Sequence, residues 1–333
     1  MMIIRPIKES DTDAFIAMIM ERGKGLTSLP KNPEFLKLKI LNSLELFKSD
    51  EAKAGMTYLF VMEDLNSKEL TGTCGIIPRT GGEHPCYFYK LTEEIRSTAN
   101  PDQKEPYLLL EPTAYHIGPS ELCGLYLKKN WRHSSFGKLL SLSRFLFIAT
   151  FRDFFEEQII AEMRGFVDKN GNYPFWEKFG KLLFNAPREE ALKILNQSKH
   201  RVHELLPRHP VYIRLLHEEV ILSLSEVHEK TKPALKMLNQ QGFTFSNEID
   251  IIDGGPKVIA ETNKVQLIRD SRSIKVKMIT PPIEEPHIHL IANEKKDFRA
   301  CYGTIDEQGG LPENLSKALN VNVGDTVRVV KKP

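Results

Sequence analysis

The stretch that decides the fold is residues 121–155, which read ELCGLYLKKNWRHSSFGKLLSLSRFLFIATFRDFF. The run from Leu122 to Leu127 is apolar and predicts a buried β-strand. A polar loop follows over residues 128–136. Gly137 then opens a long helix whose apolar side chains fill more than one stripe, so several of its sides should be buried. The segment therefore predicts a strand, a polar loop and a core helix in direct succession.

The polar loop has the composition of a phosphate-binding turn, with RHSSFG at residues 132–137. Backbone N–H groups at the start of a helix, with the positive end of the helix dipole, favour a pyrophosphate there. Arg132 would add charge-assisted hydrogen bonds. The same residues are equally compatible with an ordinary strand-to-helix connection that binds no phosphate. A Walker loop is excluded because Arg132 takes the place of its first glycine and Leu139 that of its Ser or Thr.

The elements before this stretch alternate between helix and strand. Helical spacing of apolar residues is found over residues 14–19 and again after Asn32 and Pro33. Strand-like runs over residues 57–62 and 70–77, joined by a turn, predict an antiparallel hairpin. The irregular, Pro-rich and Gly-rich region of about residues 78–119 is interpreted as an insertion with one or two further strands.

The elements after it continue the same pattern. We expect a strand over residues 159–163, a short aromatic helix with Phe175, Trp176 and Phe179, and inserted helices over about residues 186–228. The sequence Asp253-Gly254-Gly255-Pro256 is a strong boundary signal. It divides the expected domains into residues 1–255 and a small β-rich domain over residues 256–333.

Bulk composition indicates an ordinary globular protein. The 333 residues carry 46 Lys and Arg against 44 Asp and Glu, so no strong overall field favours nucleic acid as the main partner. No apolar run approaches the roughly 18 residues of a membrane span. The N-terminus lacks the pattern of a signal peptide. We therefore expect no membrane partner. The four cysteines form no CxxC pair and are expected to be reduced thiols, which favours a cytoplasmic protein.

The order of hairpin, strand, phosphate loop, buried helix, strand and aromatic helix resembles the GNAT-type acyl-CoA N-acyltransferases. In that family the loop reads Arg or Gln, two residues, Gly, one residue, Gly or Ala. Arg132 and Gly137 match this pattern, whereas Ser135 stands in place of the first glycine. The resemblance implies an α/β fold with a GNAT-like acyl-CoA N-acyltransferase core, insertions, and the small β-rich C-terminal domain.

Longer strings make the resemblance more specific, because from nearly its first residue to its last the chain is similar to the arginine N-succinyltransferase family. The shared strings are GLTSLP at 25–30, SELC at 120–123, WR at 131–132, EMRG at 162–165, PFW at 174–176, VH at 227–228 leading to PA at 233–234, and DGGP at 253–256. The resemblance implies transfer of succinyl from succinyl-CoA to the α-amino group of L-arginine in arginine catabolism. Direct attack of the amine on the thioester is preferred over a covalent intermediate.

The resemblance also implies roles for individual residues. It makes His228 the proton donor and Leu125 a contact of succinyl-CoA, the acyl donor. Such a reaction needs an acid near the departing sulfur, and an imidazole suits that task. The strand end and the loop give the remaining expected contacts of the donor: Tyr126, Leu127, Arg132, Ser135, Gly137 and Lys138. No metal is expected.

Several residues remain as alternatives. His116 and His133 flank the strand and loop and are the next candidates for the acid. The pairs His200/His203 and His287/His289 lack further ligands at a recognisable spacing, so solvated faces are the better interpretation. Carboxylates that could bind the guanidinium are Glu121, Glu162 and Asp253, and Arg164 could attract the succinyl carboxylate. Cys123 is expected to be an inert buried thiol.

Two rival functions stay open. One is acylation of a related amine such as ornithine. The other is a non-catalytic subunit that binds CoA or a partner chain. The expected partners are accordingly small molecules, with assembly into a homo-oligomer or with a paralogous subunit.

Overall fold

The computed structural model describes residues 1–23, 25–132, 135–197, 199–282 and 287–332. The chain divides into two units whose segments alternate along the sequence. Unit 1 comprises Met1–Arg79, Pro119–Glu157 and Glu261–Pro333, and unit 2 comprises Thr80–Gly118 and Gln158–Ala260. The expected division into residues 1–255 and 256–333 follows the order of the chain and stays a prediction.

Unit 1 contains the first three predicted strands, the core helix and the C-terminal strands. Its helices are α1 (Thr12–Glu21), α2 (Pro33–Lys48), α3 (Phe136–Thr150), α9 (Gln266–Asp270) and α10 (Glu313–Leu319). Its strands are β1 (Met2–Pro6), β2 (Tyr58–Asp64), β3 (Leu70–Ile77), β6 (Ser120–Leu127), β11 (Arg272–Lys275), β12 (Met278–Thr280), β13 (His289–Asn293), β14 (Ala300–Gly303), β15 (Gly310–Pro312) and β16 (Thr326–Lys331). Both predicted helices before β2, the hairpin of β2 and β3, and the succession of the strand β6 and the core helix α3 are confirmed.

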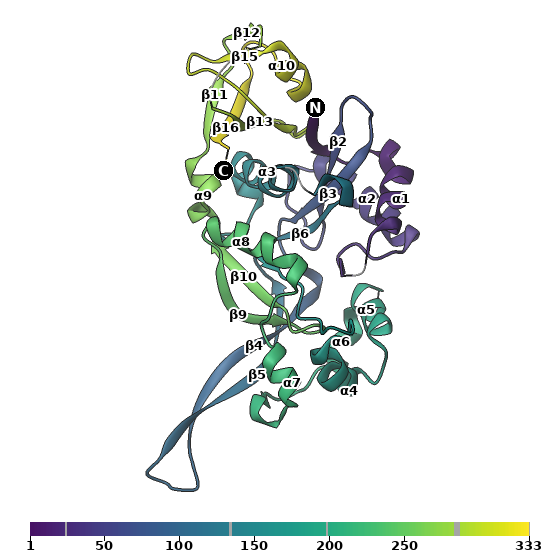
Figure 1. The fold of residues 1–333 in the computed structure, drawn as a ribbon, viewed down its shortest axis with the longest axis vertical. Coiled ribbons are helices and arrows are strands. Elements are labelled where there is room, and N and C mark those ends of the chain that lie inside the picture. The colour runs from purple at the N-terminus through teal and green to yellow at the C-terminus, as the bar shows by residue number, and fades with distance from the viewer. Residues whose placement is uncertain (24, 133–134, 198, 283–286, 333) are drawn as a thin grey trace. The chain divides into compact units, whose positions relative to one another are not determined.

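The sheet of unit 1 has the order β11-β16-β13-β14-β1-β2-β3-β6. Neighbouring strands in this order are antiparallel. The C-terminal segment is β-rich, as expected, and it extends this sheet because Ile4 of β1 pairs with Ala300 of β14. Figure 1 shows the yellow C-terminal strands next to the purple N-terminus. Strands β12 and β15 form a separate parallel pair.

Helices cover both faces of the unit 1 sheet, which explains why β2 is buried along most of its length. Alternate residues of a strand point to opposite faces. Leu59 and Val61 belong to the apolar cluster of α1 and α2. The rings of Tyr58 and Phe60 instead pack edge-on against Phe147 of α3, with centroids 5.1 Å apart in each case. Helix α3 is therefore a core helix, as its sequence predicts.

Unit 2 contains both predicted insertions. Its strands are β4 (Gly81–Ser97), β5 (Lys104–Ile117), β7 (Gln158–Glu162), β8 (Val211–Tyr212), β9 (Thr244–Asp250) and β10 (Pro256–Glu261), in the order β7-β10-β9-β4-β5-β8. Its helices are α4 (Lys181–Phe184), α5 (Arg188–Gln197), α6 (Val202–Leu205), α7 (Glu218–Ser223) and α8 (Lys232–Gln240). The predicted aromatic helix is the π-helical turn η4 (Trp176–Gly180), whose rings lie in the unit 2 core.

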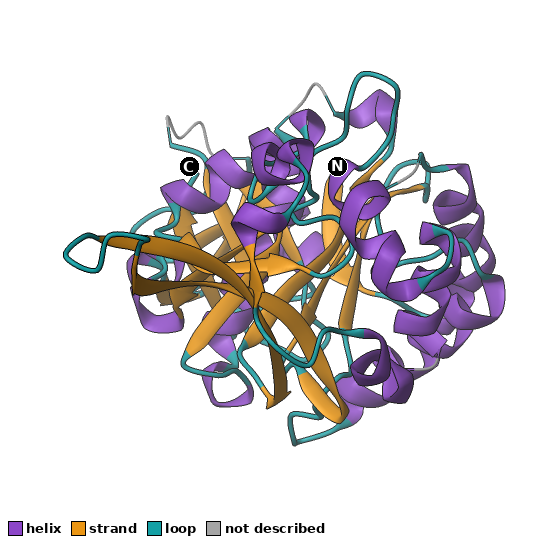
Figure 2. Cartoon of the chain, turned by 90° about the horizontal axis from the view of Figure 1, so that it is seen from below, coloured by secondary structure: helices purple, strands orange, loops and turns teal. Residues whose placement is uncertain are grey.

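The segment expected to be irregular is mostly one long hairpin. Strands β4 and β5 pair from Cys86↔Tyr115 to Ser97↔Lys104, and Figure 2 shows them as a long twisted ribbon. The prediction of one or two strands there is confirmed. Their length was not predicted, because Pro and Gly near the base of the hairpin interrupt the alternation. Among the described residues, no helix is long and apolar enough to cross a membrane.

Candidate active site

Strand β6 carries a bulge at Leu125, the position where the family resemblance implies a ligand contact. Thr73 pairs with Tyr126 and Gly75 pairs with Cys123, so Gly124 and Leu125 together face the single residue Cys74. Gly124 has φ of +62°, a left-handed conformation that a side chain disfavours. An extra residue interrupts the hydrogen-bond ladder and re-aims the backbone locally. The bulge thus gives Leu125 backbone groups that differ in direction from those of a regular strand.

Helix α3 supplies a buried arginine directly beneath this bulge. Arg144 donates hydrogen bonds to the carbonyl oxygens of Gly75 and Cys123, each at 3.4 Å. It also donates to the carbonyl and hydroxyl oxygens of Ser141, each at 2.9 Å. Sequence analysis did not single out Arg144. The signal was present, because it is the one charged residue in the apolar run from Leu139 to Ile148.

A second arginine shapes the loop that lies over the bulge. Arg22, at the end of α1, donates to the carbonyl oxygens of Leu26 and Leu29 at 2.8 and 2.6 Å. Leu29 is fully buried, and its Cδ1 atom would lie 3.5 Å from a Cβ built on Gly124. Burial lowers the pKa of Arg22. The GLTSLP segment is therefore tied to α1 on one side and packed against β6 on the other.

The predicted phosphate loop begins where β6 ends. Arg132 donates from Nε to the Leu127 carbonyl oxygen at 2.9 Å, and its guanidinium lies 5.8 Å from the centre of the Tyr126 ring. This contact anchors the loop to the strand while Arg132 remains exposed. The rival acid His133, and Ser134 beside it, lie outside the described residues.

The start of α3 is compatible with the serine that replaces the loop glycine. Ser135 has φ of −67°, which any residue adopts, and its carbonyl oxygen accepts the first helical hydrogen bond from Leu139 at 3.0 Å. A Cβ on Gly137 would meet only Leu127, at 3.9 Å. Lys138 is exposed in the first turn. The serine consequently introduces no backbone strain at this end of the helix.

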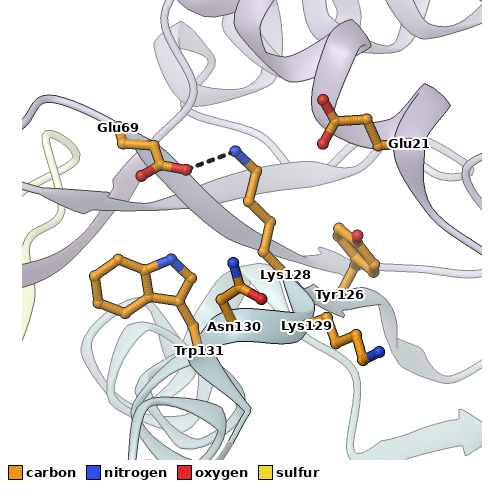
Figure 3. A pocket seen from close by; sticks show the side chains of 7 residues that line it. All are labelled: Glu21, Glu69, Tyr126, Lys128, Lys129, Asn130 and Trp131. Atoms are coloured by element: carbon orange, nitrogen blue, oxygen red, sulfur yellow. Dashed lines mark hydrogen bonds and ion pairs between the residues drawn. The ribbon is translucent and has the colours of Figure 1, made fainter.

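A cavity of about 510 Å³ adjoins the end of β6. Figure 3 shows Lys128 bridging to Glu69, 2.8 Å away, with Glu21 of α1 and Tyr126 of β6 on the opposite side. The wall is completed by Lys129, Asn130 and Trp131. Two lysines, two carboxylates and two aromatic side chains thus gather next to the predicted phosphate loop, and one of the lysines is paired with Glu69.

His228 lies in unit 2, immediately before the short helix η7 (Glu229–Thr231) that leads into α8. Its backbone N–H donates to the Arg164 carbonyl oxygen at 2.9 Å. Its Nδ1 accepts the backbone N–H of Lys230 at 3.0 Å. Because Nδ1 accepts, the neutral ring carries its hydrogen on Nε2. Burial lowers the pKa of His228, and the positive charges of Arg164 and Lys230 lower it further.

The rival acid His116 and other histidines lie on several elements. His116 is exposed on β5, and His217 caps α7 by accepting the Glu219 backbone N–H at 3.2 Å. The ring of His84 lies 6.0 Å from that of His200. Over the described ranges, no group of three or more His, Cys, Asp or Glu is placed to hold a metal ion.

The carboxylates considered for the guanidinium differ in their surroundings. Asp253 is 6% exposed and accepts the Gly255 N–H at 3.0 Å. A Cβ on Gly165 would lie 2.1 Å from the Asp253 carbonyl oxygen, so the DGGP turn is packed tightly against that glycine. Burial and the charge of Asp250 raise the pKa of Asp253. These contacts give Asp253 a structural role, whereas Glu162 is exposed and Glu121 is half-buried.

The remaining two expectations concern Arg164 and Cys123. Arg164 donates to the Tyr173 hydroxyl at 2.6 and 3.1 Å, so this guanidinium is partly engaged within unit 2. Cys123 is 7% exposed, and burial raises the pKa of its thiol to about 12. The prediction that Cys123 is a buried thiol is confirmed. None of the four cysteines forms a disulfide.

Comparison with family models finds two matches that together span almost the whole chain. Residues 2–267 match the model described as "Arginine N-succinyltransferase beta subunit". Residues 272–331 match the model of the C-terminal domain of that same beta subunit. The break between the two matches spans the end of α9 and the residue before β11.

Similar proteins and a similar structure agree with these matches. Proteins named arginine N-succinyltransferase from Citrobacter koseri and Escherichia coli are 36% and 35% identical, over 99% of this chain and 98% of each relative. A solved structure from Pseudomonas aeruginosa, described as arginine/ornithine succinyltransferase subunit AI, has a TM-score of 0.89 at 28% identity. It covers 99% of this chain and 98% of that one.

Proposed function

This chain belongs to the arginine N-succinyltransferase family, and from that premise we propose that it transfers succinyl from succinyl-CoA to the α-amino group of L-arginine. It is an acyl-CoA-dependent N-acyltransferase with a mixed α/β fold. The observation that carries the finer proposal is the bulge at Gly124 and Leu125, placed on β6 directly before the predicted phosphate loop.

In the proposed donor site, β6 and the start of α3 bind succinyl-CoA. Backbone groups of Leu125, Tyr126 and Leu127 bind the pantetheine arm. The N–H groups at the start of α3 bind the pyrophosphate, since the helix dipole favours an anion there. Arg132 and Lys138 add positive charge beside Ser135 and Gly137. This arrangement holds the thioester along the strand, with its carbonyl at the bulge.

The proposed chemistry needs no covalent intermediate. The neutral α-amine attacks the thioester carbonyl carbon, a C–N bond forms, and an electron pair moves onto the oxygen. The Leu125 backbone N–H stabilises that oxyanion, because a preorganised donor acts strongly on charge that develops during the reaction. The C–S bond then breaks, the nitrogen releases its surplus proton to solvent, and the sulfur accepts a proton.

His228 is the proposed proton donor to the departing sulfur. The Lys230 contact keeps the hydrogen of the neutral ring on Nε2, and among the described residues no hydrogen bond engages that nitrogen. The protonated ring, imidazolium, is the general acid, and the Nε2 proton is the one that it can give to the sulfur, which returns the ring to its neutral form. Solvent returns a proton to the ring in each cycle.

The proposal is tested by CoA release from succinyl-CoA or acetyl-CoA with arginine, ornithine or lysine as acceptor. We expect release with succinyl-CoA and arginine by the purified chain alone. Ornithine is the second candidate acceptor, because the Pseudomonas aeruginosa relative is described as an arginine/ornithine succinyltransferase subunit. Faster release with ornithine would assign that substrate. No release with any amine would favour a non-catalytic subunit and contradict the proposal.

Two matched histidine variants test the acid. His228→Asn and His217→Asn both replace a helix-capping imidazole by a side chain that also caps well. We expect His228→Asn to lower kcat by about 10²-fold to 10⁴-fold, the usual contribution of a general acid. His217→Asn should leave kcat near that of the wild type. Equal effects of the two substitutions would remove His228 from the mechanism.

The location and assembly of the protein are further parts of the proposal. A cytoplasmic enzyme that acts as a homo-oligomer or with a paralogous subunit stays the expectation. Size measurement of the purified chain with and without succinyl-CoA tests the assembly.

A further inference from the structure

Arg144 is an unusual residue for the interior of a core helix. The residue is 3% exposed and belongs to a run of buried, mostly apolar residues in α3. Over the described ranges, no carboxylate forms an ion pair with it, and its acceptors there are three carbonyl oxygens and one hydroxyl. A guanidinium keeps its proton in proteins, so the region retains one uncompensated positive charge.

The acceptors of Arg144 place this charge at the bulge rather than at an arbitrary point of the core. The carbonyls of Gly75 and Cys123 belong to residues that pair across β3 and β6, immediately before the interruption of the ladder. The Cys123 carbonyl is part of the peptide unit that leads into Gly124. Arg144 contacts this oxygen from the side of α3. The contact holds the orientation of the peptide plane at which the bulge begins.

We propose that Arg144 is a positioning residue for acyl transfer, which fixes the bulge of β6 through the Cys123 carbonyl and lends its positive charge to the oxygen that becomes negative during the reaction. This inference rests on the proposed function, since it takes the bulge to be where the thioester carbonyl binds. The guanidinium acts through the backbone of Gly124 and Leu125 and does not itself touch the substrate.

Electrostatics favour this role over a purely structural one. Burying an isolated charge is unfavourable, and neutral acceptors offset that only in part. Burial accordingly lowers the pKa of Arg144. In a water-poor interior the remaining charge acts over a longer range than at the surface, so it stabilises an oxyanion at the bulge.

The test compares Arg144 with another buried arginine of the same unit. Arg144→Lys keeps a charge but loses the planar guanidinium, whose Nη1 reaches both strands while Nε and Nη2 hold Ser141, and Arg144→Met loses the charge as well. Arg5→Met is the control, because Arg5 is 6% exposed but belongs to a different network, on β1. For each variant, kcat, KM for both substrates, CoA affinity and Tm are measured, and kcat is referred to the folded fraction.

We expect kcat to fall about 10-fold in Arg144→Lys and about 10²-fold in Arg144→Met, at the low end of the roughly 10²-fold to 10³-fold loss when a donor in direct contact with the oxyanion is removed, because Arg144 acts through the backbone. CoA affinity should change less than about 3-fold. Arg5→Met should lower Tm and leave kcat unchanged. If Arg144→Met does not fold, two milder variants remain: Arg144→Lys, and Ser141→Ala, which removes one acceptor of the guanidinium. In both variants the change in kcat is compared with the change in CoA affinity.

Two outcomes overturn the inference in distinguishable ways. An active wild type with unchanged kcat in the folded Arg144 variants, or a kcat loss that parallels weaker CoA binding, contradicts the role of Arg144 alone. A wild type that releases no CoA with any amine contradicts the proposed function and this inference together.

Discussion

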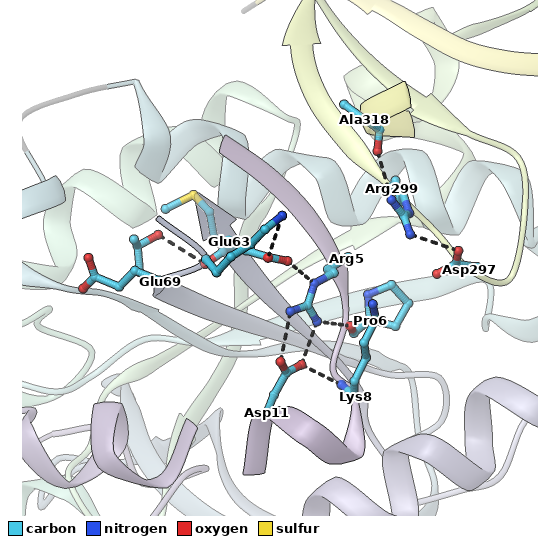
Figure 4. A network of polar contacts seen from close by, with 12 residues as sticks. Arg5, Pro6, Lys8, Asp11, Glu63, Glu69, Asp297, Arg299 and Ala318 are labelled. Carbon is cyan, nitrogen blue, oxygen red and sulfur yellow. Dashed lines mark hydrogen bonds and ion pairs between the residues drawn. The ribbon is translucent and has the colours of Figure 1, made fainter. Parts of the chain in front are cut away.

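Two buried arginines of unit 1 are held in opposite ways. Arg5 on β1 bridges two carboxylates: it donates to Asp11 at 2.6 and 3.0 Å and to Glu63 at 2.5 Å (Figure 4). Burial alone would lower the pKa of Arg5, but its hydrogen bonds to Asp11 and Glu63 outweigh burial and raise it. Arg144 has only neutral acceptors, and burial lowers its pKa.

The difference teaches that the charge of Arg5 stabilises the fold, whereas the charge of Arg144 has no ion-pair partner among the described residues and is available to act on a substrate. In the β1 network, the carboxylates of Asp11 and Glu63 compensate the positive charge of Arg5. The electrostatic field of this charge is therefore weak beyond the network. At the β6 bulge the charge has no counter-ion among the described residues. A negative charge that forms transiently at the bulge would complete this second network, as Asp11 and Glu63 complete the first.

The largest expected effect concerns stability at the β1 network. Arg5→Met leaves the buried Asp11 carboxylate without its guanidinium partner, whereas the half-buried Glu63 keeps Lys68 at 4.0 Å, and the free energy of unfolding should fall by about 3 kcal/mol. Denaturant unfolding of wild type and variant measures this loss. Activity per folded molecule should not change, and a fall in kcat after correction for the folded fraction would undo the distinction between the two arginines.

The next effect concerns the backbone of the bulge. Gly124→Ala places a Cβ on a residue with φ of +62°, which is unfavourable by about 1–2 kcal/mol and should be relieved by a shift of Leu125. We expect kcat to fall by about 10-fold to 10²-fold. Gly324→Ala is the matched control, because Gly324 has φ of +98° with no neighbouring atom within 4 Å and lies in the C-terminal segment. Comparable kcat losses in both variants would contradict the role of the bulge.

A smaller effect is expected at the thiol that precedes the bulge. Cys123→Ala should lower stability by about 1 kcal/mol and change kcat by less than about 3-fold, since direct transfer does not use the thiol. Loss of all activity, or a trapped succinyl-thioester on the wild-type chain, would show a covalent route instead.

The same thiol gives a pH dependence of stability. Its pKa is raised to about 12 by burial, whereas an unfolded cysteine titrates near 8.5. Between about pH 9 and 12 the native state keeps a proton that the unfolded state releases, so stability falls as pH rises. The fall should be shallower in Cys123→Ala in urea unfolding series across this range.

The smallest effect is the pH dependence that His228 contributes. Burial lowers its pKa in the folded protein, so the unfolded chain binds the proton first as pH falls below about 6.5. The contribution of His228 to stability is therefore lost at acidic pH. The stability difference between wild type and His228→Asn should shrink from pH 7 to pH 5, and a difference that grows would mean that the native pKa is raised.

The local elements of the site were predictable, and its long-range geometry was not. The apolar run before residue 128, the polar loop and the start of α3 follow from spacing alone. The bulge depends on the register between β3 and β6, in which Gly75 pairs with Cys123, 48 positions along the chain. The residues of neither strand alone specify this register. The apolar neighbours of Arg144 in the sequence predict its burial, but they do not predict which groups accept its hydrogen bonds.

The same limit applies to the units as a whole. The pairing of Ile4 with Ala300 joins the two ends of the chain in one sheet, although the tail reads as an independent β-rich segment. The function and the role of His228 were predicted from the family resemblance. The spacing of residues in the sequence does not by itself support either prediction.

The most direct test is a crystal structure with an unreactive succinyl-CoA analogue in which a methylene group replaces the thioester sulfur. The account predicts that the carbonyl oxygen of the analogue lies within about 2.7–3.1 Å of the Leu125 backbone nitrogen, the distance at which an oxyanion donor acts. A carbonyl bound away from the β6 bulge, with the nucleotide away from the start of α3, would contradict it.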